Sequence, residues 1–104
     1  MQNIVYVKLG INKKIMNRQI WKYTMALGST ELELPMGAEI VHVASQHDTP
    51  CIWVLVDINA EKEIRTFEWY GTGQSIFTPD NRNYVGTIQL AEGTLVYHLF
   101  EIIL

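Results

Sequence analysis

The sequence has one cysteine and few charged residues. Cys51 has no partner for an internal disulfide, a pattern typical of proteins in a reducing compartment. Charged residues make up 18% of the chain, against about 25% in an average soluble domain. With 48% hydrophobic residues, this composition excludes a disordered chain. A monomer of this composition has little polar surface, so we expect a homo-oligomer, either a dimer or a tetramer.

Clustered basic residues and long apolar runs are also missing. Eight Lys and Arg against eleven Asp and Glu give a net charge of −3, which argues against a DNA or RNA duplex as partner. No apolar run approaches the ~20 residues of a membrane span. Lysines follow the apolar patch at Ile4–Val7, whereas in a secretory signal they precede it. We therefore expect a protein without a membrane partner.

Catalytic and metal-binding patterns are missing as well. Cys51 follows Pro50 at the start of an apolar segment, so an inert buried thiol is favoured despite the nearby His47. No G-x-S-x-G elbow occurs, and no local motif pairs two carboxylates. His42 and His98 lie in separate segments, which favours structural hydrogen bonds over metal ligation. The sequence thus predicts no enzyme, no cofactor and no metal, although catalytic groups that meet only in the fold stay an alternative.

The chain consists of short alternating apolar segments separated by turn residues. Its 104 residues fit one domain. Residues 11–20 are the best helical candidate, with a thin apolar stripe. The stronger signals predict strands over Gln19–Leu27, Glu31–Leu34, Ala38–Gln46, Cys51–Val56, Glu63–Tyr70, Tyr84–Leu90 and Thr94–Ile103. We expect an all-β fold, an antiparallel sandwich or partly open barrel, over residues 20–104, with residues 1–19 as an N-terminal extension or first strand.

Two of these segments are apolar on both faces. Cys51–Val56 is typical of a central strand covered on both sides. Thr94–Ile103 is either central too or partly covered by another subunit. Between strands, Pro35 is expected at the first central position of a turn with Gly37 at positive φ. Ala91–Gly93 reads as a short hairpin connection.

Glycine, aromatic and basic residues suggest a ligand site. Gly71-Thr72-Gly73 lacks the lysine of a P-loop, so it is either a simple break between strands or a place where backbone amides approach an anion. Trp69 and Tyr70 precede it and point to opposite faces. Aromatic and basic residues also adjoin at Lys22-Tyr23 and at Arg82–Tyr84. Such groups stack on nucleobases and bind phosphate. They also occur without any ligand, as aromatic residues of a sandwich core with solvent-exposed basic residues at its ends.

The order of several motifs resembles a family of small, mostly phage-encoded proteins. The matching pieces are Ile20–Thr24, Leu34–Ala38, Pro50–Asp57, Tyr70–Gly73, Tyr84–Gln89 and Gly93–Glu101. Family members often carry His after the G-T-G triplet, where this chain has Gln74. The resemblance implies a phage protein acting in the cytoplasm of an infected bacterial host.

The chain also resembles, in size and character, the sponges by which phages evade bacterial immunity. These small oligomers sequester nucleotide signals such as cyclic oligonucleotides (the signals of CBASS defence) or ADP-ribose derivatives. The resemblance implies that this protein binds such a second messenger without cleaving it. The alternative is a protein-interaction or virion-accessory module acting through apolar strand faces. The candidate ligand-binding residues are Lys22, Tyr23, Tyr70, Gly71, Thr72, Gly73, Arg82, Tyr84 and His98.

Overall fold

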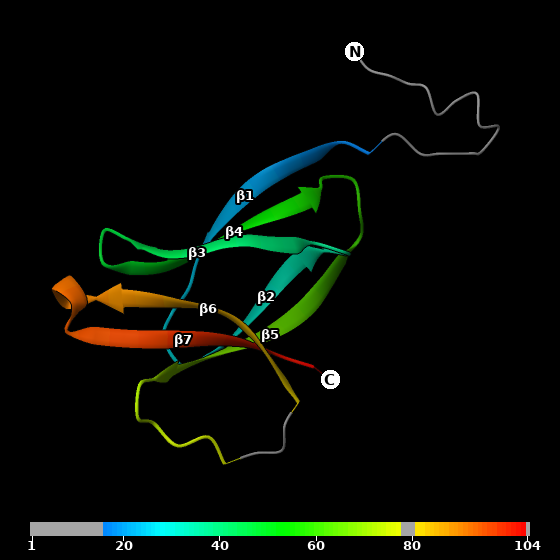
Figure 1. The fold of residues 1–104 in the computed structure, drawn as a ribbon. Coiled ribbons are helices and arrows are strands. Elements are labelled where there is room, and N and C mark those ends of the chain that lie inside the picture. The colour runs from blue at the N-terminus through cyan, green and yellow to red at the C-terminus, as the bar shows by residue number, and fades with distance from the viewer. Residues whose placement is uncertain (1–15, 78–80, 104) are drawn as a thin grey trace.

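In the part of the chain that the structure describes, seven strands form two antiparallel sheets packed face to face (Figure 1). The computed structural model describes residues 16–77 and 81–103. A three-stranded sheet has the order β1-β4-β3 and a four-stranded sheet the order β2-β5-β7-β6. The elements are β1 (Arg18–Thr24), β2 (Ser29–Pro35), β3 (Glu39–Gln46), β4 (Thr49–Asp57), β5 (Lys62–Gly71), β6 (Arg82–Leu90), a 3-10 turn η2 (Ala91–Gly93) and β7 (Leu95–Ile102). The predicted all-β sandwich is confirmed, and its two sheets are not closed into a barrel.

The best helical candidate, residues 11–20, is not a helix where the structure describes it. Arg18 to Ile20 belong to β1, which pairs with β4 over its whole length. The apolar stripe was too thin to hold a helix, and pairing with a buried strand decides the local structure instead. Residues 11–15 lie outside the described residues.

The core lies between the inner faces of the two sheets. Leu34, Ile52, Val54, Phe67 and Leu99 have no exposed surface. They come from β2, β4, β5 and β7, so all four strands meet in one apolar cluster. Their alternation with outward-facing residues is the period-2 pattern from which the strands were predicted.

Both strands that are apolar on two faces are central. β4 lies between β1 and β3, and its inner residues Ile52 and Val54 are fully buried. On its outer face Trp53 is half-buried and packs on the His42 ring at 5.4 Å between centroids. β7 lies between β5 and β6, which confirms the first of the two alternatives for that segment. Covering by a second subunit stays a prediction.

The turn after β2 differs in one detail from the sequence prediction. Gly37 has a φ of 78°, as expected. However, the Ala38 N–H donates to the Pro35 carbonyl at 3.1 Å, so Pro35 is the first residue of the turn and Met36 its first central residue. Pro35 still pairs with β5, and its ring is buried there.

Two hairpin turns meet at one end of the sandwich. His47 and Asp48 connect β3 to β4 with φ values of 51° and 59°, and Ala91 and Glu92 connect β6 to β7 with 51° and 54°. The Ala91 N–H donates to the Asp48 Oδ1 at 2.8 Å and ties the two turns together. Left-handed backbone at four non-glycine residues is uncommon, and this cross-link stabilises it. Gly93, with a φ of 89°, supplies the positive φ expected for this connection.

The sandwich is closed along one side, where β3 packs against β6. Each strand carries an irregularity there, between Ile40 and His42 in β3 and between Tyr84 and Gly86 in β6. An ideal Cβ placed on Gly86 would lie 2.9 Å from the Val43 Cβ, so only glycine fits at this contact. The shift in β6 also decides which residues face outward before and after it.

A second link joins the layers near the end of β7. The Arg65 guanidinium makes a two-point contact with Glu101, with Nε at 2.7 Å and Nη2 at 2.8 Å from its carboxylate oxygens. The Arg65 Nη1 also donates to the Ala38 carbonyl at 2.6 Å. Both side chains are less than one-fifth exposed, and the Glu101 contact raises the pKa of Arg65.

Candidate binding face

The outer face of the four-stranded sheet gathers most of the nominated residues. The strand register places Tyr70 of β5 opposite His98 of β7, and Tyr84 of β6 opposite Phe100 of β7. Arg82 lies two residues before Tyr84 on the same face. Alternation along each strand and the shift after Tyr84 send these side chains away from the core. We call this surface, from Glu68, Tyr70, Arg82, Tyr84, Thr87, His98 and Phe100, the β5-β7-β6 face.

Three aromatic rings form its centre. Phe100 packs edge-on against Tyr70 at 5.9 Å and against Tyr84 at 5.7 Å between centroids, with interplanar angles of 76° and 68°. Tyr84 is 60% exposed, whereas Tyr70 and Phe100 are half-buried. Edge-to-face packing fixes the rings in place. The Tyr84 ring is therefore a held but accessible aromatic surface.

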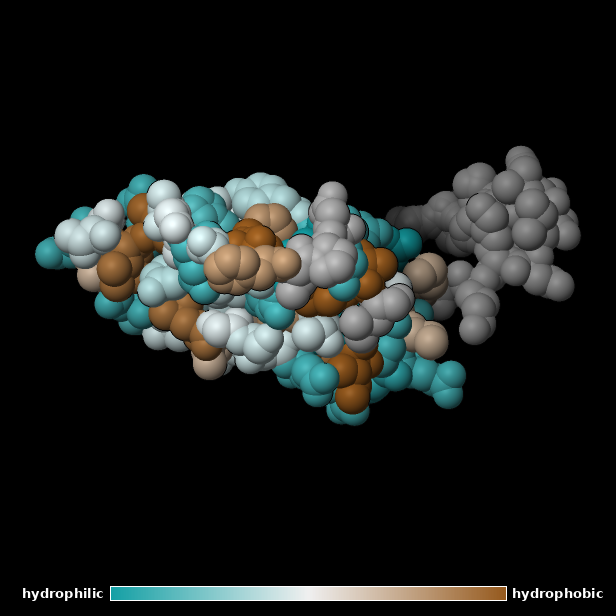
Figure 2. Space-filling view, turned by 90° about the horizontal axis from the view of Figure 1, so that it is seen from below, coloured by the Kyte–Doolittle hydropathy of each residue, from teal (hydrophilic) through white to brown (hydrophobic). Residues whose placement is uncertain are grey.

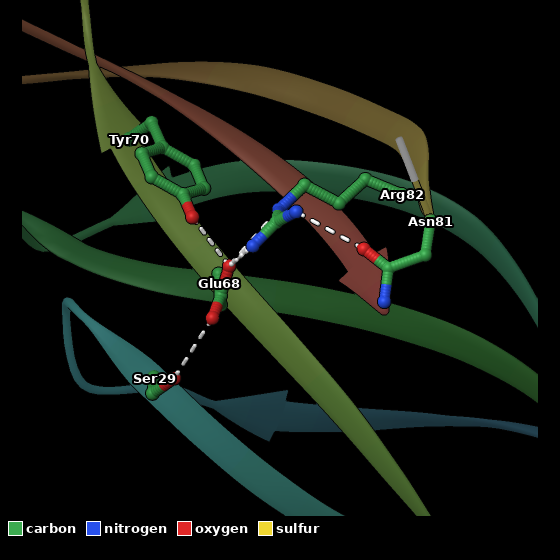
Figure 3. Close-up of polar contacts among 5 residues, drawn as sticks. All are labelled: Ser29, Glu68, Tyr70, Asn81 and Arg82. Atoms are coloured by element: carbon green, nitrogen blue, oxygen red, sulfur yellow. Dashed lines mark hydrogen bonds and ion pairs between the residues drawn. The ribbon is translucent and has the colours of Figure 1, made fainter. Parts of the chain in front are cut away.

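A polar cluster centred on Glu68 borders the rings (Figure 3). Its Oε1 accepts hydrogen bonds from the Tyr70 hydroxyl at 2.5 Å and from the Arg82 Nη2 at 2.8 Å. Its Oε2 lies 3.4 Å from the Ser29 hydroxyl on β2. Arg82 also contacts Asn81 through Nη1, and its guanidinium lies 5.7 Å from the centre of the Tyr70 ring. The cluster joins β2, β5 and the start of β6.

The cluster shifts the ionisation of its members. The Tyr70 hydrogen bond, helped by the Arg82 contacts, lowers the pKa of the Glu68 carboxyl below its usual value. The bond to Glu68 raises the pKa of the Tyr70 phenol, and the Glu68 contact raises the pKa of Arg82. At neutral pH the cluster thus holds one carboxylate, one guanidinium and one neutral phenol. Its positive and negative charges compensate each other.

Hydroxyl groups hold His98 on both sides. The Thr87 Oγ1 lies 3.0 Å from His98 Nδ1, and the Thr72 Oγ1 lies 2.7 Å from Nε2. The Thr87 hydroxyl also contacts the Tyr84 hydroxyl at 2.5 Å. A hydroxyl donates or accepts by rotation, so this row adapts to either tautomer of the ring. It offers polar groups beside the exposed Tyr84 ring.

The glycine turn lies at one end of the face, and two of its amides are engaged within the chain. The Gly71 N–H donates to the Gln74 side chain at 2.9 Å, and the Thr72 N–H donates to the Val96 carbonyl at 3.1 Å. An anion must displace the Gln74 side chain to reach the Gly71 amide. A hollow of about 320 Å³ adjoins this turn, lined by Gly71, Thr72 and residues 94–97.

Two nominated residues lie elsewhere. Lys22 and Tyr23 belong to β1, in the opposite sheet. The Lys22 Nζ donates to the Gln46 side chain, and Tyr23 packs partly against the core, where burial raises the pKa of its phenol. The two sheets separate these residues from the β5-β7-β6 face. Neither reaches a ligand bound there within one copy of the chain.

Sequence reasoning missed three residues of the face. Phe100 and His98 are two apart in β7, so alternation alone places both on one face. The same rule places Glu68 with Tyr70. Thr87 had no comparable signal, because the shift in β6 breaks the alternation after Tyr84.

Apolar and polar side chains are interspersed on the uncovered part of this side of the molecule. Seen from below (Figure 2), apolar residues appear as separate brown areas among polar ones. Phe77 and Ile76, which follow the glycine turn, are 91% and 42% exposed. In Figure 1 this stretch of the chain runs below the four-stranded sheet.

Within residues 16–77 and 81–103, no three His, Cys, Asp or Glu side chains gather as metal ligands. Over the same ranges, no helix is long and apolar enough to cross a membrane.

Comparison with known proteins places the chain in a family. A family model described as "Domain of unknown function (DUF7352)" matches residues 16–103. This match covers most of the chain and shows membership of that family. No curated protein and no solved structure matches the chain.

Proposed function

We propose that this chain, as a member of the DUF7352 family, is a non-catalytic nucleotide-binding protein whose binding site is the β5-β7-β6 face. One observation carries the proposal. Residues nominated for nucleotide chemistry in three distant segments, at Tyr70–Gly73, Arg82–Tyr84 and His98, come together around one aromatic cluster. Sequestration of a bacterial immune signal by a phage protein in the host cytoplasm follows from the resemblance described above.

The chemistry of the face suits a nucleobase better than a bare phosphate. The exposed Tyr84 ring offers a stacking surface, and the hydroxyl–His98 row offers hydrogen bonds at its side. Arg82 is the cation of the face, and Glu68 compensates its charge. A ligand therefore gains mainly from stacking and hydrogen bonds, with a limited gain from charge.

The size of these contributions points to a second subunit. Stacking on an aromatic side chain contributes about 1–3 kcal/mol per base. A nanomolar sponge needs about 12 kcal/mol of binding free energy. The β5-β7-β6 face of one copy is open on one side, so enclosure of the ligand between two copies supplies the missing contacts. The proposal thus includes a homo-oligomer with the ligand at its interface.

Calorimetry against cyclic dinucleotides, cyclic trinucleotides and ADP-ribose derivatives tests this proposal. Denaturing the complex and identifying the released molecule by mass spectrometry distinguishes binding from turnover. We expect one class to bind and to be recovered intact. Recovery of a cleaved product would make the protein an enzyme, and absence of binding across the panel would overturn the proposal.

A second function is favoured by a different surface. On the outer face of the β1-β4-β3 sheet, Ile20 and Val41 are 59% and 49% exposed beside the His42–Trp53 ring pair. This surface supports the alternative of a protein-interaction or virion-accessory module. Ile20→Glu abolishes copurification of a protein partner if this function holds, and it leaves nucleotide binding unchanged.

A further inference from the structure

The side of the sandwich opposite the β3–β6 contact is bordered by β1 and β2. Each is the last strand of its sheet there, and among the described residues the two share no packing comparable to that of β3 with β6. β2 pairs with β5 on one side only (Figure 1). Leu32 of β2 and Trp21 of β1 face inward at this side but stay half-buried. Within the described part of the chain, β2 thus has a free edge.

The hydrogen bonds at both ends of β2 decide which main-chain groups face this free edge. The Trp69 N–H donates to the Gly28 carbonyl at 3.0 Å before the strand, and the Met36 N–H donates to the Glu61 carbonyl at 2.7 Å after it. Both bonds continue the uninterrupted register of β2 with β5. In an antiparallel ladder, residues that bond to the neighbouring strand alternate with residues whose main-chain groups face the other way. Even-numbered residues of β2 therefore bond to β5, and odd-numbered residues direct their N–H and carbonyl groups to the free edge.

The odd-numbered residues in the middle of β2 are two glutamates. Glu31 and Glu33 thus offer main-chain groups to the edge, and their side chains are exposed on the outer face. Neither carboxylate takes part in an ion pair or a hydrogen bond within residues 16–77 and 81–103. Ile64, in register with Glu33, is 61% exposed. Pro35 has no N–H, so strand pairing along this edge ends before it. Residues 29–33 therefore form a short acidic edge that is able to pair.

A second copy that uses its own β2 is a poor occupant of this edge. Antiparallel addition centred on Glu31 places this residue opposite itself, and a shift of two residues places it opposite Glu33. A shift of one residue turns the outer side chains of one copy toward the core side of the other. Like charges directly opposite each other destabilise strand pairing. The two glutamates therefore disfavour self-association and favour a strand of opposite charge.

An extended segment with alternating basic and apolar residues fits the edge. Side chains opposite Glu31 and Glu33 lie on the outer face, and the side chain between them lies on the inner face beside Leu32. Lysine or arginine at the two outer positions pairs with the carboxylates. An apolar residue at the middle position covers the half-buried Leu32. The charge and the burial of β2 thus ask for the pattern basic–apolar–basic.

We propose that the free edge of β2 binds such a basic–apolar–basic segment of another protein as an added strand. Main-chain hydrogen bonds to Glu31 and Glu33 hold the segment, and the alternate side chains select it. This surface is distinct from the outer face of the β1-β4-β3 sheet. The inference does not depend on nucleotide binding, and its test uses no nucleotide.

Residue-resolved hydrogen exchange of the full-length chain tests the proposal. The probe is a blocked synthetic peptide, Thr-Lys-Val-Lys-Val-Thr, and the control is a peptide of the same composition with its two lysines adjacent. We expect a saturating amount of the probe to slow exchange of the Glu31 and Glu33 amides about tenfold or more, because these N–H groups face the free edge. The Leu32 amide, which bonds to β5, is protected with or without the probe. The control peptide leaves the Glu31 and Glu33 amides within about twofold of the free protein.

Two substitutions at Glu33 separate the main-chain contribution from the charge. Glu33→Gln keeps the N–H and removes the carboxylate, so it weakens binding of the fluorescently labelled probe about two- to fivefold in an anisotropy titration. Glu33→Pro also removes the N–H, which makes no bond to β5, and weakens binding at least about fivefold further. Glu92→Gln, the same charge change in the distant η2 turn, leaves the affinity unchanged. Circular dichroism of each variant confirms that the sheet is intact.

Three results would overturn the proposal. One is unchanged exchange of the Glu31 and Glu33 amides at a millimolar concentration of the probe. Another is equally tight binding of the adjacent-lysine peptide, because charge attraction then acts without strand pairing. The third is protection of these two amides without any peptide. If that protection is lost on dilution, a second copy occupies the edge, and if it is independent of concentration, the chain covers the edge itself.

Discussion

Replacing Gly86 by alanine tests the β3–β6 contact that closes the sandwich. The new Cβ would lie 2.9 Å from the Val43 Cβ and 3.0 Å from its Cγ2. Val43 is β-branched, with its Cβ fixed by the strand backbone, so it moves away only if β3 shifts. Overpacking of this kind costs about 1–3 kcal/mol. At about 4–8 °C per kcal/mol for a domain of this size, the melting temperature falls by roughly 4–24 °C.

Gly71→Ala is the matched control. Its Cβ would meet the Tyr97 ring at 3.6 Å, an ordinary contact, and its φ is not left-handed. We expect this variant to stay within about 0.5 kcal/mol of the wild type. Val43→Ala combined with Gly86→Ala removes the contacts with the two Val43 Cγ atoms, at 3.0 Å and 3.4 Å, but keeps the 2.9 Å contact with the Cβ. The two changes together therefore cost less than their sum, while part of the Gly86→Ala loss remains. Equal melting temperatures for Gly86→Ala and Gly71→Ala, with additive double-mutant energies, would refute the close contact.

Further predictions concern the core, the Arg65–Glu101 pair and the Glu68 cluster. Leu99→Ala removes a fully buried side chain and costs about 2–5 kcal/mol in denaturant unfolding, whereas a loss under 1 kcal/mol would contradict its central place. Glu101→Ala leaves the Arg65 guanidinium without its carboxylate and costs about 1.5–3 kcal/mol, and a double-mutant cycle with Arg65→Met must show coupling. The lowered pKa of Glu68 contributes stability that is present above its unfolded pKa of about 4.3 and is lost as pH falls through the lower folded value. Glu68→Gln removes that pH dependence, and ultraviolet titration must then show Tyr70 ionising at lower pH than in the wild type.

Much of the fold is predictable because the strands alternate. In β5 the inner residues Phe67 and Trp69 are two positions apart, as alternation requires, and Gly37 marks its turn correctly. The helical candidate gives way to a strand over Arg18–Ile20 for a tertiary reason, since pairing with β4 decides a segment of weak local preference. The irregularity after Tyr84 depends on the contact with β3, which no local pattern in β6 reveals.

The candidate site is predictable in chemistry but less so in position. Tyr70, Tyr84 and His98 were nominated by residue type and do converge. Lys22 was nominated by the same reasoning, yet it lies on the other sheet, because β1 pairs with β4 and not with a strand of the β2-β5-β7-β6 sheet. Assigning residues to sheets requires long-range pairing, which a single sequence does not specify.

The most direct test of the account is the nucleotide affinity of two variants measured side by side by calorimetry. Tyr84→Ala removes the exposed ring of the β5-β7-β6 face, whereas Lys22→Ala removes a nominated group on the opposite sheet. Loss of one stack, about 1–3 kcal/mol, predicts that Tyr84→Ala weakens binding by roughly 5- to 150-fold while Lys22→Ala stays within twofold of the wild type. Unchanged affinity in Tyr84→Ala, or an equal loss in both variants, would contradict the placement of the site on this face.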